Sequence, residues 1–158
     1  MPWSWPGSEL DVETRDSVLR DVTREFTALA KSAEDVDPIA WWRAAEEKLL
    51  SVATEVASEH NVEETVPDLA AMLALGAVDS ALHDAWSRAA GRPAHTMYGA
   101  DHLSEDLSGL FGEEFTGVWP GDFLQPARDS LEAQHLVGAS DPLTVADATK
   151  GNARLSNG

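Results

Sequence analysis

Apolar residues recur every three or four positions over residues 10–91, which is the spacing of one face of an α-helix. The first run predicts a helix over residues 11–31, and Asp11 is placed to cap the free amides of its first turn. The apolar stripe of this helix consists of Leu19, Val22, Phe26, Leu29 and Ala33. Most positions between them are charged, so the helix is amphipathic.

A second helix begins at Asp37-Pro38, because aspartate is a good N-cap and proline is tolerated at the first helical position. It ends in the polar stretch at residues 58–61. Its predicted stripe consists of Trp42, Ala45, Leu49, Val52 and Val56, with Trp41 at the edge. We interpret the adjacent tryptophans as packing residues rather than as a ligand platform.

The third predicted helix is the most apolar, with a start signal at residues 65–68 and a Gly-Arg-Pro stop at residues 91–93. One half of its surface carries Ala71, Ala74, Leu75, Val78, Ala81, Leu82 and Ala85. Short connections between three helices favour an antiparallel helical cluster. The predicted fold class is therefore mainly α.

The periodicity is lost after Pro93. A short turn of helix is predicted near residues 95–98, followed by a glycine-rich segment with many large apolar residues: Leu107, Leu110, Phe111, Phe115, Val118, Trp119, Phe123 and Leu124. Such groups in irregular chain must be covered, or they form an adhesive surface. Residues 131–139 predict one strand without a partner, and the small polar residues at 144–158 predict a flexible tail.

Charge and length exclude several classes of protein. Eleven Lys and Arg against 28 Asp and Glu give a net charge of −17, which repels nucleic acid and anionic membranes. The 158 residues are fewer than the roughly 250 of a complete β/α barrel. Cysteine is absent, which excludes thiolate metal sites, and no apolar run approaches the ~20 residues of a membrane span. We predict a soluble, cytoplasmic protein.

Asp79 and His83 are the pair of residues that most resembles a metal site, because a spacing of four places them on one side of a helix. Asp84 lies about 100° away, and two ligands are too few for a structural or catalytic divalent ion. We therefore interpret the pair as the border of a helix interface. For His135, in the predicted strand, packing is favoured over a site role facing a partner sheet.

The remaining polar candidates do not form a recognisable constellation. His60, His95 and His102 are dispersed, and Glu113-Glu114 is most simply a solvated surface. No nucleophile-elbow motif or glycine-rich phosphate loop occurs. The residues alone predict no catalytic, cofactor-binding or metal-binding site.

Residues 77–99 nevertheless resemble a known family. They combine a small-residue helix bearing Asp79, Ala81-Leu82 and Asp84 with the glycine-proline stop and a short segment ending at Gly99. This order is similar to the last helix of the N-terminal capping domain in the mandelate racemase and muconate lactonizing enzyme group of the enolase superfamily. Residues 130–143 are similar to the first barrel strand and following loop of a subset of that group, so the resemblance covers roughly residues 5–145.

The resemblance implies a cap domain joined to a β/α barrel. In that family, Mg2+ held by three barrel carboxylates stabilises the enolate that forms when a barrel lysine or histidine removes the proton next to a carboxylate. The reactions are racemisation, epimerisation, cycloisomerisation and dehydration. The sheet expected before the helices and the barrel after its first strand have no counterpart here, and Lys150 matches no family lysine.

We therefore expect a truncated, catalytically silent protein. Residues 1–10 form an N-terminal extension, residues 11–99 a cap-type helical domain, and residues 100–143 an irregular cap-to-barrel junction. A carboxylate substrate and Mg2+ are expected only in full-length relatives. The alternative is a self-standing acidic helical module that uses residues 107–124 to bind a partner or itself.

Overall fold

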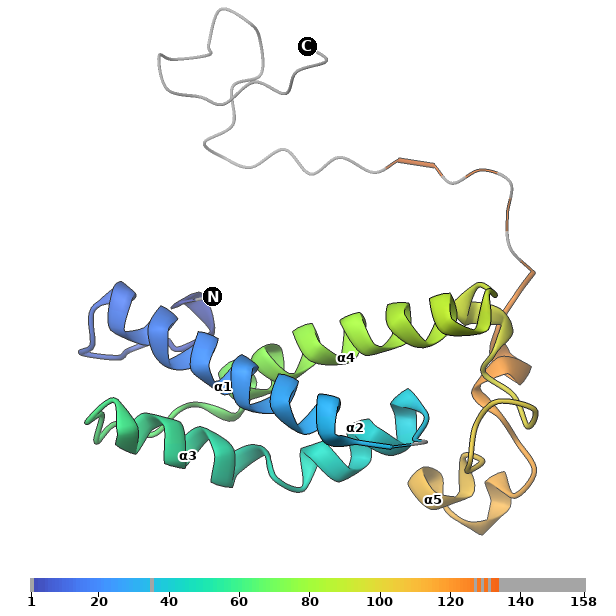
Figure 1. Cartoon of the computed structure of the whole chain (residues 1–158), viewed down its shortest axis with the longest axis horizontal. Helices are drawn as coiled ribbons and strands as arrows, with labels where there is room; N and C mark the ends of the chain where they lie inside the picture. The colour runs from blue at the N-terminus through green and yellow to red at the C-terminus, as the bar shows by residue number, and fades with distance from the viewer. Residues whose placement is uncertain (1, 35, 127, 129, 131, 134–158) are drawn as a thin grey trace, which may run out of the picture. The chain divides into compact units, whose positions relative to one another are not determined.

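The computed structural model describes residues 2–34, 36–126, 128, 130, 132 and 133 (Figure 1). The chain divides into two units, residues 1–124 and residues 125–158, and every element below lies in the first. The α-helices are α1 (Val12–Ser32), α2 (Pro38–Glu46), α3 (Leu49–Glu59), α4 (Asp68–Ala90) and α5 (Ser108–Phe111). Short 3-10 turns occupy Pro2–Ser4, Ala94–Thr96, Glu113–Phe115 and Pro120–Phe123. The mainly α class is confirmed, and the described residues contain no strand.

The long helices form an antiparallel cluster around one apolar core. In Figure 1, α1 and α4 run in the same direction. The helices α2 and α3, which follow α1 and precede α4 in the sequence, run in the opposite direction. The core draws on all four helices and on the segments that flank them. Its buried members include Trp5, Val18, Leu19, Val22, Phe26, Trp41, Ala53, Val56, Ala70, Ala71, Ala74, Leu75 and Val78.

The sequence accounts for the close packing of α1 on α4. Asp11 caps α1 by accepting a hydrogen bond from the Thr14 amide at 2.7 Å. Three residues on the facing side of α4, Ala70, Ala71 and Ala74, have no exposed surface. Because alanine has no side chain beyond Cβ, the two backbones approach closely and large α1 residues such as Phe26 fill the remaining space.

The N-terminal residues also take part in this core. Trp5 is 1% exposed, and the Arg15 guanidinium donates to its carbonyl oxygen at 2.9 Å. A buried tryptophan contributes one of the largest apolar areas available to any residue. The segment before α1 is therefore attached to the helices by packing and by a hydrogen bond.

The prediction of a single helix from Asp37 to residues 58–61 is wrong in its continuity. A turn at Glu47 and Lys48 divides it into α2 and α3. The buried residues Ala45 before the turn and Leu49 after it still follow the spacing of four that one helical face requires, so the break leaves the apolar stripe in register.

The two tryptophans exchange the places predicted for them. Trp41 is 4% exposed and belongs to the core, whereas Trp42 is only partly buried against it. Both tryptophans lie at helical spacing from Ala45 and Leu49, Trp42 at three and seven residues and Trp41 at four and eight, so spacing did not distinguish them. Their interpretation as packing residues is consistent with both environments.

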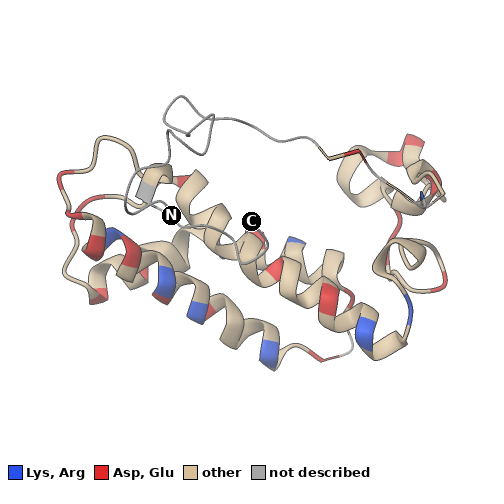
Figure 2. Ribbon diagram, turned by 90° about the horizontal axis from the view of Figure 1, so that it is seen from above, with Lys and Arg blue, Asp and Glu red and all other residues tan. Residues whose placement is uncertain are grey.

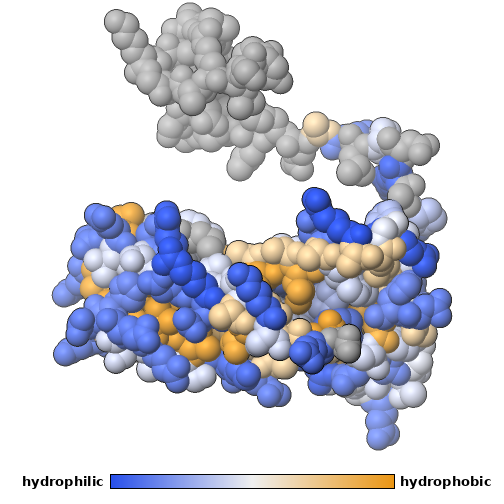
Figure 3. Space-filling view, in the orientation of Figure 1, coloured by the Kyte–Doolittle hydropathy of each residue, from blue (hydrophilic) through white to orange (hydrophobic). Residues whose placement is uncertain are grey.

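The apolar face of α4 is also shorter than predicted. Burial ends at Val78, with Leu82 partly packed against the core, and Ala81 and Ala85 are exposed. Figure 3 shows a moderately apolar ridge along α4. No helix of the core covers these positions, so alanine periodicity alone overestimated the length of the interface.

Beyond α4 the backbone turns as predicted at Gly91, whose φ of 63° lies in the left-handed region that favours glycine. The turn expected near residues 95–98 is the 3-10 turn Ala94–Thr96. The strand predicted near 131–139, with His135, and the tail at 144–158 lie outside the described residues except for 132 and 133. No helix in the described part is long and apolar enough to cross a membrane. Acidic side chains outnumber basic ones along the long helices (Figure 2).

Candidate functional site

A compact loop over residues 106–118 is the main feature outside the helical core. Asp106 closes its base by accepting hydrogen bonds from the Ser108 amide at 2.9 Å, the Ser108 hydroxyl and the Gly117 amide at 2.6 Å. The Leu107 amide also donates to the Val118 carbonyl at 2.9 Å, so the two ends of the loop meet. The bonds from Gly117 and Ser108 lower the pKa of Asp106, which keeps the carboxylate charged at neutral pH.

This loop, which we call the 106–118 loop, exposes large apolar side chains to water. Phe111 is 61% exposed and Leu110 is 48% exposed, and the rings of Phe111 and Phe115 lie 5.4 Å apart. Phe123 and Leu124, which follow the loop, are 62% and 45% exposed. The sequence left open whether the apolar residues of 107–124 are covered or form an adhesive surface. Within the described chain, these four side chains are exposed.

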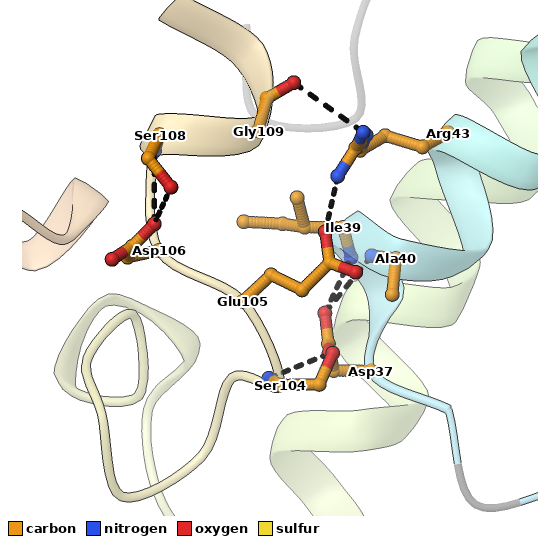
Figure 4. Close-up of polar contacts among 9 residues, drawn as sticks. All are labelled: Asp37, Ile39, Ala40, Arg43, Ser104, Glu105, Asp106, Ser108 and Gly109. Atoms are coloured by element: carbon orange, nitrogen blue, oxygen red, sulfur yellow. Dashed lines mark hydrogen bonds and ion pairs between the residues drawn. The ribbon is translucent and has the colours of Figure 1, made fainter. Parts of the chain in front are cut away.

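Two side chains of α2 attach the loop to the helices (Figure 4). Asp37 is 8% exposed and accepts four hydrogen bonds. Its Oδ1 accepts from the Ile39 and Ala40 amides, both at 3.0 Å, and its Oδ2 accepts from the Ser104 amide at 3.0 Å and from the Ser104 hydroxyl. Burial by itself raises the pKa of Asp37, but the hydrogen bonds from Ser104, Ala40 and Ile39 outweigh burial and lower it.

Arg43, further along α2, makes the second attachment. Its guanidinium forms an ion pair with Glu105 and donates to the Gly109 carbonyl at 3.4 Å (Figure 4). A Cβ atom at position 109 would lie 2.9 Å from Arg43 Nη1, the flexible end of that side chain, so a larger residue would displace the guanidinium from its present position. The helices therefore hold the chain in two places: just before the loop, at Ser104 and Glu105, and within the loop, at Gly109.

The predicted pair Asp79 and His83 lies where the chain that follows α4 is attached to α4 through Tyr98. His83 Nε2 is 3.4 Å from Asp79 Oδ1, and His83 Nδ1 is 3.0 Å from the Tyr98 hydroxyl. Because a carboxylate can only accept, a neutral His83 ring fits this arrangement with its proton on Nε2, and Nδ1 then accepts from the tyrosine hydroxyl. Burial raises the pKa of Asp79 although His83 opposes it, and burial also raises the pKa of Tyr98. The three groups satisfy one another and hold Tyr98 against α4.

Sequence spacing found Asp79 and His83 but missed the aromatic residues around them. The His83 ring makes edge contacts with Trp86 and Tyr98, with centroids 6.3 and 5.6 Å apart. Trp86 also meets the ring of His102, whose Nε2 is 3.2 Å from Arg92 Nη1. Tyr98 follows the glycine-proline stop, so only the return of the chain after that stop brings it beside α4.

The other predicted polar residues are separated from this cluster. Asp84 is paired with Arg88 at 2.8 Å on the surface of α4, which agrees with its predicted displacement from His83. His60 contacts Asp21 of α1 at 2.8 Å, and His95, Glu113 and Glu114 are exposed. Within the described ranges, no three or more His, Asp or Glu side chains are grouped as an ion requires.

The fold and the site together define a small helical protein with a closed core and a fastened, apolar, exposed loop. Comparisons with family models, with curated proteins and with solved structures give no match.

Proposed function

We propose that this chain is a cap-type helical unit of the mandelate racemase and muconate lactonizing enzyme group, and that its role is to pack against a β/α barrel. The observation that carries the proposal is the 61% exposure of Phe111 on a loop that Asp106 closes and that α2 holds in place. Large apolar groups presented on a rigid scaffold are typical of interaction surfaces. The resemblance of residues 77–99 supplies the identity of the partner.

In this proposal the chemistry belongs to the barrel. The family removes a proton next to a carboxylate, and bound Mg2+ stabilises the resulting enolate. The described residues do not fit such an ion, because their acidic and histidine side chains form no group of three or more that could hold it. We therefore assign no step of the reaction to this chain, and we place the protein in the cytoplasm, without nucleic acid among its partners.

The alternative function, a self-standing acidic interaction module, is favoured by a different observation. The helices bury Trp5, Phe26, Trp41 and Leu75 among themselves, so their core needs no barrel to cover it. Such a module would bind another protein or a second copy of itself through residues 107–124. A monomer with one cooperative unfolding transition and no binding of an apolar dye would argue against the orphaned-cap proposal.

Binding to a barrel tests the proposal directly. The probe is the barrel domain of an enzyme of this group, produced without its own cap and mixed with the full chain. We expect association, and we expect Phe111→Ser to weaken it by about tenfold or more, since an aromatic anchor at the centre of an interface is worth about 2 kcal/mol. Sedimentation velocity measures the affinity.

Leu50→Ser is the matched control, because Leu50 is 56% exposed on α3, away from the 106–118 loop in the sequence. It should leave the affinity unchanged. Equal losses in the two variants would show that general apolar exposure, rather than the loop, drives association. Self-association without barrel binding would favour the interaction module.

A further inference from the structure

We infer that Asp37 is a positioning residue, which sets the 106–118 loop for docking separately from its role in capping α2. This inference rests on the proposed docking function of the loop. Its basis is that the two oxygens of one carboxylate have different partners. Among the described residues, Oδ1 accepts from the α2 amides of Ile39 and Ala40, and Oδ2 accepts from Ser104.

The two tasks are coupled in space but separable in chemistry. N-capping requires one acceptor oxygen, which asparagine supplies as well as aspartate. Holding Ser104 requires a second acceptor, because both Ser104 groups donate to Oδ2. An amide NH2 in that place cannot accept from the Ser104 amide, although the Ser104 hydroxyl can turn and accept from it, so Asp37→Asn keeps the cap and weakens the attachment by the bond from the Ser104 amide.

Burial makes this attachment strong. Asp37 is 8% exposed, and a hydrogen bond to a charged, poorly hydrated carboxylate contributes more than one at the surface. Figure 4 shows Arg43 acting on the same side of α2, where it reaches Glu105 and Gly109. Ser104 lies two residues before the start of the loop, so loss of its attachment releases Ser104 while Arg43 still holds Glu105 and Gly109.

Losing the bonds to Ser104 weakens docking because the loop becomes less ordered before binding, not because a contact with the partner is lost. A loop held in its docking conformation before the partner arrives loses less conformational freedom on binding. Asp37 itself need not touch the barrel for this effect. A role in stability alone would instead lower the unfolding midpoint and leave the affinity of the folded protein unchanged.

Hydrogen exchange of the full chain, followed by mass spectrometry, tests the inference. For Asp37→Asn we expect exchange over residues 104–109 to rise by about tenfold or more, while exchange over residues 39–46 of α2 changes little. Ser104→Ala, which removes one of the two donors and leaves the cap intact, should give a smaller rise in the same segment. Affinity for the barrel domain should fall about tenfold in Asp37→Asn without a matching fall in the unfolding midpoint.

Asp11→Asn is the control, since Asp11 also caps a helix through Oδ1, which accepts from the Thr14 amide, and its Oδ2 accepts within the same turn, from the Thr14 hydroxyl. It should leave exchange over residues 104–109 unchanged. Unchanged exchange there in both Asp37→Asn and Ser104→Ala overturns the inference, as does an equal rise throughout α2. Faster exchange at 104–109 in a protein whose wild type does not bind the barrel would uphold the attachment and count against the proposed function instead.

Discussion

Trp41 and Trp42 are neighbours of one residue type in very different surroundings. Trp41 lies in the core at 4% exposure, and Trp42 covers part of the core while remaining partly in contact with water. The hydrophobic contribution of a side chain follows the apolar area that folding removes from water. Two identical truncations at adjacent positions should therefore have unequal effects.

Trp41→Ala should lower the free energy of unfolding by about 3–5 kcal/mol, because it leaves a cavity between α2 and the rest of the core. Trp42→Ala should cost about 1–2 kcal/mol. Urea titration followed by circular dichroism measures both values. A larger loss for Trp42 would contradict the assignment of Trp41 to the core and of Trp42 to its partly exposed edge.

At the scale of elements, the contact between His60 and Asp21 joins the end of α3 to the middle of α1. Hydrogen bonds from His60 and Arg24 lower the pKa of Asp21 below its ordinary value of 3.8. Because the folded-state pKa is the lower one, the stabilisation is fully present above the ordinary value. It is lost as the pH falls through the lowered value and the carboxylate becomes protonated.

Asp21→Asn should accordingly destabilise the protein at about pH 7, and the difference from the wild type should shrink as the pH falls through the lowered pKa of Asp21 and its carboxyl becomes protonated. Unfolding midpoints in urea across this range provide the measurement. Asp84→Asn is the comparison, since its pair with Arg88 is exposed and lies within one helix. A pH-independent difference between Asp21→Asn and the wild type would exclude the linkage.

At the scale of the whole molecule, a self-sufficient helical core contrasts with the exposed 106–118 loop. The core residues of α1, α3 and α4 pack against one another, although single apolar residues such as Val12, Leu50 and Leu69 are exposed, whereas the loop exposes Phe111 and Leu110 together. This contrast is expected for a unit that folds alone and binds afterwards. It separates the stability of the protein from its proposed role, so variants of the loop should retain the fold.

The purified chain should be catalytically silent in the reaction of the family. With Mg2+ and mandelate in deuterated water, proton NMR should detect no exchange of the α-proton beyond that in a sample without protein. The reason is that the proposal places the ion and the base on the barrel. Exchange that depends on added chain and on Mg2+ would refute this part of the proposal, and an active racemase provides the positive control.

Much of the fold was predictable because helix signals are local. Asp11, Asp37-Pro38 and Gly91 act within one turn of the chain, and their caps and stops occur where predicted. The site was less predictable. Helical spacing identified Asp79 and His83, but Tyr98 joins them from beyond a turn, and Ser104 reaches Asp37 across 67 positions of sequence.

The sequence by itself therefore determined the helical class, the starts of α1 and α2, the stop of α4 and the net acidic charge, since each depends on residue type and on neighbours within a few positions. Only the tertiary structure decided which tryptophan is buried, where the face of α4 ends and which apolar residues remain exposed. Those outcomes depend on which elements meet in space. The same physical cause makes Asp37 both a local cap, visible in the sequence, and a distant attachment that only folding creates.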